Sequence, residues 1–121
     1  MNKNNLVFKD DYVTAFIKSN NKNNIHIIIF PNKKIKSLNE IEESDNIYLS
    51  KILLTAKLLA KKFNIHETGY NLINNCNNNI NHELNFLHFH LIENYQYNND
   101  ISLLKNNYID DLDDFFSFNE F

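Results

Sequence analysis

Two histidines, separated by one residue, lie in the segment Phe86–Ile92. Because side chains alternate across a β-strand, the pattern predicts one face with His88 and His90 and an opposite, apolar face. Phe86 shares the histidine face, and the apolar face carries Leu87, Phe89 and Leu91. A neutral imidazole can act as a nucleophile, a proton carrier or a metal ligand. A buried imidazole without a hydrogen-bond partner costs about 1–3 kcal/mol. The pair therefore predicts a ligand, a metal or bound water at this face.

Taken alone, a His-x-His pattern leaves two other interpretations open. The pair can be a half-exposed surface feature with no chemistry. It can also hold a metal, since imidazole is a common metal ligand. That site would need a third ligand, which Cys76, His82 or Glu83 could supply only if the preceding loop folds back.

A sheet and a helix are expected to position this segment. Hydrophobic alternation and turn residues predict five strands: Leu6–Phe8, Tyr12–Ile17, Ile25–Phe30, Tyr70–Asn74 and Leu84–Ile92. Lys9–Asp11 reads as a turn, and Pro31 ends the third strand because proline cannot donate to a ladder. The fold class is α+β: an antiparallel sheet of about five strands with one long helix and a short helix.

Both helices have start patterns in the sequence. Ser37–Glu40 matches a capping box and predicts a short helical turn. Ser44 is the expected cap of the long helix, which should end near Asn64. Its apolar positions recur at helical spacing: Ile47, Ile52, Leu53, Ala56, Leu59, Ala60 and Phe63. With one glycine in the chain, asparagine is expected wherever a turn needs a positive φ.

The bulk composition narrows the function classes. The 121 residues suit one domain, expected over residues 1–95, followed by an acidic and aromatic tail over residues 96–121. A net charge of −3 argues against a nucleic-acid partner, which normally needs a basic surface. No apolar run is long enough for a membrane span, and no signal peptide is visible. A single cysteine, Cys76, fits a reducing, cytoplasmic setting.

The segment Phe86–Ile92 resembles the histidine triad (HIT) family motif, His-φ-His-φ-His-φ-φ with φ apolar, with phenylalanine at its first position. Phe8–Phe16 looks like the family's opening hairpin. His26–Pro31, followed by Asn32-Lys33-Lys34, looks like its strand ending in Pro-x-Lys. Gly69–Asn75 is similar to the penultimate strand. The resemblance covers Leu6 to about Ile92 and implies a homodimer whose sheet continues across both subunits.

The resemblance implies a nucleoside-phosphoramidase-like hydrolase acting on a purine nucleotide or nucleotide conjugate. His88 matches the nucleophile that forms a nucleotidyl-histidine intermediate, and a main-chain carbonyl, here of Phe86, orients its ring. His90 matches the histidine that binds phosphate or assists the leaving group. The expected substrate-binding residues are His26, Asn75, Phe86, His82 and Glu83. The mechanism requires no cofactor, and no metal site is assigned.

Four features depart from the family pattern. Phe86 removes one imidazole, and Lys18 replaces an acidic residue that holds the ribose. Glu83 replaces a serine, and the glycine-rich phosphate loop is Asn77–Asn81, which includes Ile80. The alternative function is therefore a catalytically degenerate nucleotide-binding protein. A third hypothesis is an interaction protein that acts through Asp110–Phe121.

Overall fold

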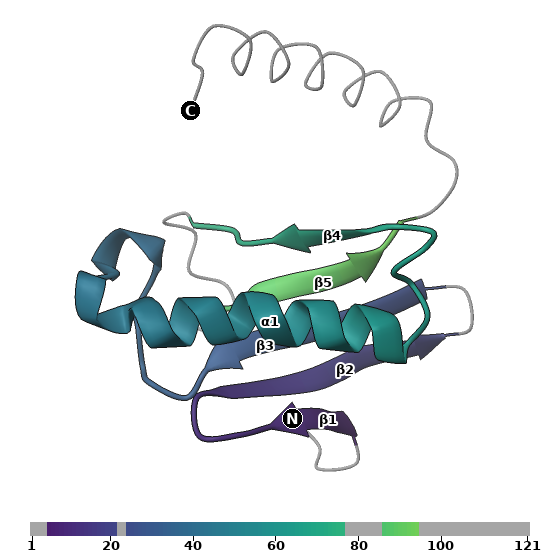
Figure 1. Cartoon of the computed structure of the whole chain (residues 1–121). Coiled ribbons are helices and arrows are strands. Elements are labelled where there is room, and N and C mark those ends of the chain that lie inside the picture. The colour runs from purple at the N-terminus through teal and green to yellow at the C-terminus, as the bar shows by residue number, and fades with distance from the viewer. Residues whose placement is uncertain (1–4, 22–23, 77–85, 95–121) are drawn as a thin grey trace, which may run out of the picture.

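The computed structural model describes residues 5–21, 24–76 and 86–94, which form one sheet and one long helix (Figure 1). In chain order the elements are β1 (Leu6–Lys9), β2 (Val13–Asn21), β3 (Asn24–Pro31), the 3₁₀ turns η2 (Leu38–Glu40) and η3 (Glu43–Asp45), α1 (Asn46–Lys62), β4 (Tyr70–Ile73) and β5 (Phe89–Glu93). The strands run antiparallel in the order β1-β2-β3-β5-β4. This confirms the predicted α+β class. None of the helices in these ranges has the length and apolar character needed to cross a membrane.

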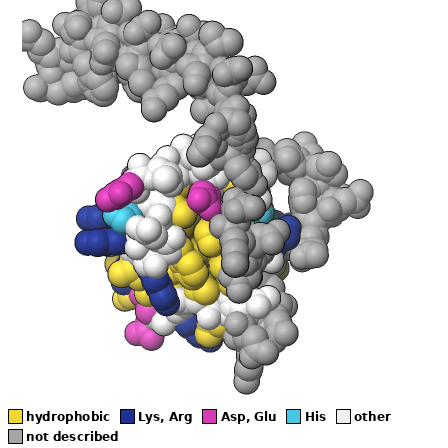
Figure 2. Space-filling model, turned by 90° about the vertical axis from the view of Figure 1, so that its right-hand side faces the viewer, with side chains coloured by type: hydrophobic (Ala, Val, Ile, Leu, Met, Phe, Trp, Pro, Cys, Tyr) yellow, Lys and Arg dark blue, Asp and Glu magenta, His cyan; other side chains and the backbone are white. Residues whose placement is uncertain are grey.

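The core lies between α1 and one face of the sheet (Figure 1). Alternate residues of β2, β3 and β5 point into it, as the strand period of two requires, and α1 contributes one stripe. The core members are Val13, Ala15, Ile17, Ile27, Ile29, Ile52, Ala56, Leu59, Ala60, Ile65 and Leu91. Figure 2, which views the molecule from the right-hand side of Figure 1, shows hydrophobic side chains near the centre of this surface, with charged ones around them. The remaining side chains of these strands point to the opposite face of the sheet, which α1 does not cover.

The predicted apolar stripe of α1 is correct at five positions and wrong at two. Ile47 is 45% exposed and Leu53 is 59% exposed, so neither belongs to the core. Leu54 and Leu58 are also more than half exposed. The helix thus has a second apolar side that faces away from its own sheet.

The long helix does not begin at Ser44, so that prediction is wrong. Ser44 lies inside η3, and the residue that precedes α1 is Asp45. The Asp45 carboxylate accepts a hydrogen bond from the backbone N–H of Glu42 at 3.0 Å. It also pairs with Nζ of Lys33 at 2.5 Å. Asp45 is buried, and its hydrogen bond with Lys33 lowers the pKa of its carboxyl group.

The C-terminus of α1 confirms that asparagine takes the place of glycine. Asn64 has φ of 61°, in the left-handed region. Its N–H donates to the Lys61 carbonyl at 3.1 Å, and the N–H of Ile65 donates to the Ala60 carbonyl at 2.8 Å. These two bonds define a Schellman motif. Ile65 is then delivered into the core, where it is 2% exposed.

The strand that carries the histidines is shorter than predicted. Instead of spanning Leu84–Ile92, β5 begins at Phe89, and Leu84 lies outside the described residues. Phe86–His88 lead into the strand and are held by a bond from the Leu87 N–H to the Ile35 carbonyl at 2.8 Å. Leu87 is 3% exposed, so the alternation of buried and open side chains still holds there.

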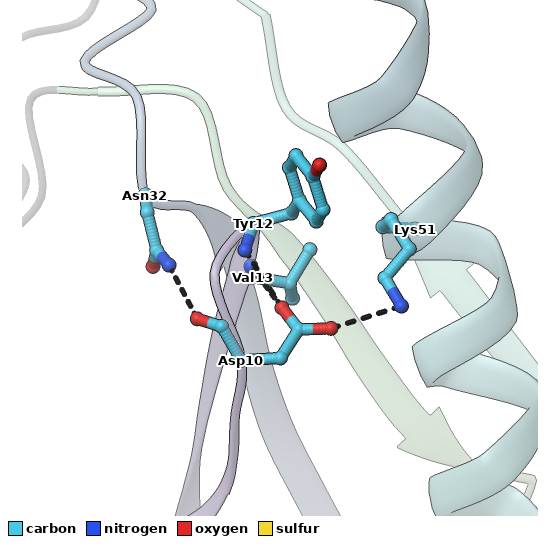
Figure 3. A network of polar contacts seen from close by, with 5 residues as sticks. All are labelled: Asp10, Tyr12, Val13, Asn32 and Lys51. Atoms are coloured by element: carbon cyan, nitrogen blue, oxygen red, sulfur yellow. Dashed lines mark hydrogen bonds and ion pairs between the residues drawn. The ribbon is translucent and has the colours of Figure 1, made fainter.

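Asp10 connects the turn between β1 and β2 to helix α1 (Figure 3). One carboxylate oxygen accepts from the N–H groups of Tyr12 and Val13, each at 2.8 Å. The other pairs with Lys51 of α1 at 2.9 Å. Burial alone would raise the pKa of Asp10, but the hydrogen bonds from Lys51, Tyr12 and Val13 outweigh it and lower the pKa. Asn32, just after β3, donates to the Asp10 carbonyl at 2.8 Å.

Candidate active site

His26, His88 and His90 come together on the helix-free face of the sheet. In the β3–β5 ladder His26 pairs with Ile92 and Ile28 pairs with His90, so the two histidines are diagonal neighbours. Nε2 of His26 lies 2.8 Å from Nδ1 of His90. The ring centroids of His26 and His88 each lie 5.0 Å from that of His90. Three imidazoles therefore form a continuous row that begins on β3 and ends just before β5.

The ring of His88 is held in one tautomer. Its Nδ1 lies 2.8 Å from the carbonyl oxygen of Phe86. A carbonyl oxygen can only accept, so Nδ1 must carry a proton, and in the neutral imidazole Nε2 then carries the lone pair. The resemblance predicted this carbonyl contact, and it depends on the backbone of Phe86 rather than on its side chain.

His26 is held neutral by its surroundings. Burial lowers its pKa below 6.5, and the nearby charge of Lys18 lowers it further. The contact joins one donor and one acceptor, so either His26 Nε2–H donates to His90 Nδ1 or His90 Nδ1–H donates to His26 Nε2. In the first case Nε2 of His90 carries a proton. In the second case Nε2 carries a lone pair in the neutral ring and a proton in the imidazolium.

Asn74, the residue that follows β4, supports His88, and reasoning from the sequence missed it. Its amide Nδ2 donates to the His88 carbonyl at 2.9 Å. The β4–β5 register ends at the pair Ile73–His90, and Asn75 follows as an exposed residue two positions beyond Ile73. The run of asparagines that ends this strand concealed the difference between Asn74 and Asn75.

Phe86 occupies the start of the histidine face and is 43% exposed. Nζ of Lys34 lies 5.8 Å from the centroid of its ring, within cation–π range. Farther along the same face, the rings of Phe16 and Phe30 lie nearly parallel, with centroids 6.1 Å apart. The site thus combines imidazoles with an aromatic surface on β2 and β3.

Two expected substrate-binding residues, His82 and Glu83, lie outside the described residues, as does the loop Asn77–Asn81. Within the ranges that the structure covers, no group of three or more His, Cys, Asp or Glu side chains is arranged to hold a metal. Cys76 is a free thiol and is partly buried.

Comparisons with known proteins indicate one family. Residues 1–97 match the HIT domain family. An uncharacterized HIT-like protein of Buchnera aphidicola subsp. Baizongia pistaciae is 42% identical over 87 residues, which are 72% of this chain and 78% of that protein. The purine nucleoside phosphoramidase of Escherichia coli K12 is 33% identical over 87 residues, covering 72% of this chain and 73% of the enzyme.

Solved structures show the same fold. A HIT family hydrolase from Legionella pneumophila superposes with a TM-score of 0.69 at 31% identity, covering 79% of this chain and 86% of that one. A HIT family hydrolase from Clostridium thermocellum gives the same TM-score at 30% identity, covering 79% and 84%. The chain belongs to the HIT family.

Proposed function

We propose that the chain hydrolyses a phosphoramidate or ester of a purine nucleoside monophosphate, with His88 as the nucleophile. The observation that carries the proposal is the 2.8 Å contact from His88 Nδ1 to the Phe86 carbonyl. It leaves the lone pair on Nε2, the atom that must attack phosphorus. The similarity to the purine nucleoside phosphoramidase of E. coli supports the substrate class.

The first step forms the bond from His88 Nε2 to the α-phosphorus and breaks the bond from phosphorus to the leaving nitrogen or oxygen. His88 becomes an N-phosphorylated imidazolium, whose Nδ1–H donates to the Phe86 carbonyl. A charge-assisted hydrogen bond of this kind stabilises the positive ring. A covalent intermediate divides one difficult displacement into two easier ones.

His90 supplies the proton to the leaving group. This role requires the imidazolium form of His90, in which Nδ1–H donates to His26 Nε2 and Nε2–H donates to the leaving group, so that the ring is neutral after the transfer. In the second step a water molecule attacks phosphorus and gives a proton back to His90. The bond to His88 then breaks, and both imidazoles return to their starting states.

The nucleoside part is proposed to lie over β2 and β3, where Phe16 and Phe30 offer an aromatic surface for a base. Asn75, His26 and Phe86 are proposed to line the substrate site, together with His82 and Glu83 from the preceding segment. We place the reaction in the cytoplasm, where nucleotides are abundant and the lone Cys76 would stay reduced.

We propose that the protein acts as a homodimer. The edge strand β4 has an unpaired outer edge within the described sheet, and Ile47, Leu53, Leu54 and Leu58 expose an apolar side of α1. A second copy would cover both surfaces. Residues 1–95 would form the catalytic domain, with residues 96–121 as a separate tail. Light scattering should give twice the chain mass, and Leu54→Asp with Leu58→Asp should give a monomer; a wild-type monomer would refute the dimer.

Turnover of adenosine 5′-phosphoramidate, with release of AMP, tests the activity. Wild type should turn over, and His88→Ala should lose at least about 10³-fold, because no other group replaces the nucleophile. His66→Ala alters an exposed histidine outside the site and serves as the matched control. Rapid quenching followed by intact-protein mass spectrometry should show an AMP adduct on wild type only. Equal turnover by wild type and His88→Ala would refute the proposed role.

The replacement of an imidazole by Phe86 favours a second candidate, a nucleotide-binding protein without efficient chemistry. Calorimetry with AMP separates the two functions. Binding with no measurable turnover by wild type would favour the binding protein. Absence of both would exclude both candidates.

A further inference from the structure

Lys18 occupies an irregular position in β2, directly beside the histidine row. Ile17 pairs with Ile27 and Ser19 pairs with His26, so Lys18 is the extra residue of a β-bulge. In a bulge two residues oppose one on the partner strand, which places Lys18 next to His26. Ile17 lies in the core, whereas Lys18 is exposed and close enough for its charge to act on His26, which assigns its side chain to the helix-free side.

The charge of Lys18 is available to a ligand. The side chain is exposed, and within residues 5–21, 24–76 and 86–94 it forms no ion pair. A carboxylate near this end of the sheet, that of Glu93, accepts the backbone N–H of Ile25 at 3.1 Å. The effect of Lys18 on the pKa of His26 shows that its charge reaches the site.

The distance between β2 and β5 indicates which anionic group of a ligand Lys18 can contact. His90 is on β5 and Lys18 is on β2, with β3 between them. The backbones of β2 and β5 are therefore two strand spacings, or about 10 Å, apart. Directly linked phosphates share a bridging oxygen and lie much closer than this, so a β-phosphate would stay near the histidines. An anion separated from the reacting phosphate by a sugar ring fits the span better.

The aromatic surface of Phe16 and Phe30 indicates how a nucleoside would lie relative to Lys18. Phe16 lies two residues before Lys18 on the same side of β2, and its ring is stacked near that of Phe30. A nucleoside that rests its base on these rings leaves its ribose between them and the histidines. The ribose hydroxyls then lie within reach of the long Lys18 side chain.

Accordingly, we propose that Lys18 selects nucleotides that carry a second phosphate on the ribose, at the 2′ or 3′ oxygen. The inference rests on the proposed function, because it takes the reacting phosphate to lie at His88 and His90. Lys18 is thus a specificity-determining residue that contacts the substrate away from the reacting atoms.

Calorimetry with AMP, adenosine 2′,5′-bisphosphate and adenosine 3′,5′-bisphosphate tests the proposal. Wild type should bind one of the bisphosphates about fivefold more tightly than AMP, as expected for one exposed ion pair. Lys18→Met should bind AMP and that bisphosphate equally, and Lys18→Glu should favour AMP. The control, Lys9→Met, removes an equal charge from an exposed residue of β1 and should keep the wild-type preference.

The outcomes separate this inference from the proposed function. Equal affinity of wild type for all three ligands, or a preference that survives in Lys18→Met, overturns the role of Lys18 while AMP binding and turnover still stand. Loss of all binding and turnover in wild type overturns both. The two bisphosphates tell which ribose oxygen carries the selected phosphate.

Discussion

The carbonyl oxygen of Phe86 holds Nδ1 of His88 at 2.8 Å, although Phe86 itself replaces a histidine of the family motif. The contact uses the backbone, which every residue type possesses. The change of side chain therefore removes an imidazole from the site without removing the group that fixes the tautomer of His88. This is why the altered motif is compatible with a nucleophilic His88.

Replacing the Phe86 side chain should leave turnover within about threefold of wild type. The main-chain carbonyl stays in place, so its hydrogen bond with His88, worth about 1 kcal/mol, is kept. Phe86→Ala tests this prediction in steady-state assays with adenosine 5′-phosphoramidate. Phe86→His restores the full motif and provides the matched comparison. A loss of a hundredfold in Phe86→Ala would show that the ring, rather than the backbone, positions His88.

Asn74 should act as a positioning residue through the His88 carbonyl. In Asn74→Ala the loss of this bond should lower kcat about tenfold, while the affinity for AMP stays within about twofold, because displacement of a catalytic group mainly affects the chemical step. Asn71→Ala removes a similar exposed bond, to Asn94, and should retain wild-type kcat. Equal kcat values for Asn74→Ala and wild type would contradict this role.

The lowered pKa of His26 makes stability depend on pH. Below pH 6.5 the unfolded chain binds a proton at this position before the native state does, so the free energy of unfolding should fall as the pH drops through the window just under 6.5. Above that window the residue contributes no pH dependence. Urea unfolding at several pH values should show a shallower dependence in His26→Gln. The control His66→Gln should keep the wild-type slope.

Lys18 and His26 are coupled, and the coupling can be measured directly. Lys18→Met should raise the pKa of His26, since the ammonium charge lowers it. Titration of the His26 ring by nuclear magnetic resonance reads out this shift. An unchanged or lower value in Lys18→Met would show that the two side chains do not interact.

The Asp10 network should stabilise the first turn (Figure 3). Asp10→Ala loses two backbone hydrogen bonds and one ion pair, which together contribute about 1–3 kcal/mol. Because the pKa of Asp10 is lowered, its contribution is present above pH 3.8 and is lost as the pH falls through the lower, native value. Asp11→Ala, at the exposed neighbour, is the control in thermal unfolding and should be nearly neutral.

Local patterns in the sequence were sufficient to predict the strands and the helix. The alternation around Leu91 and the stripe through Ile52 and Leu59 each reflect burial, which a single segment can report. Ile47 and Leu53 were assigned to the same stripe because hydrophobicity alone does not tell which partner covers a residue. The start of α1 was misjudged because the capping box is formed by Glu42 and Asp45 around the turn η3, one turn before the helix, rather than by Ser44.

The site was predicted only in outline. His88 and His90 belong to one segment, so their shared face follows from the strand period. The bond between His26 and His90 joins positions 64 residues apart and depends on β3 pairing with β5. Asn74 could not be distinguished from its asparagine neighbours, since its role follows from where β4 ends.

The bulge in β2 exempts Lys18 from the requirements of folding, which usually limit the residues that can contact a ligand. Lys18 neither fills the core nor pairs in the β2–β3 ladder, whereas Ile17 and the backbone of Ser19, on either side of it, do. Substitutions at this one position can therefore accumulate without affecting folding. Evolution can change which molecules the protein accepts here while the histidines and their supporting strands stay as they are.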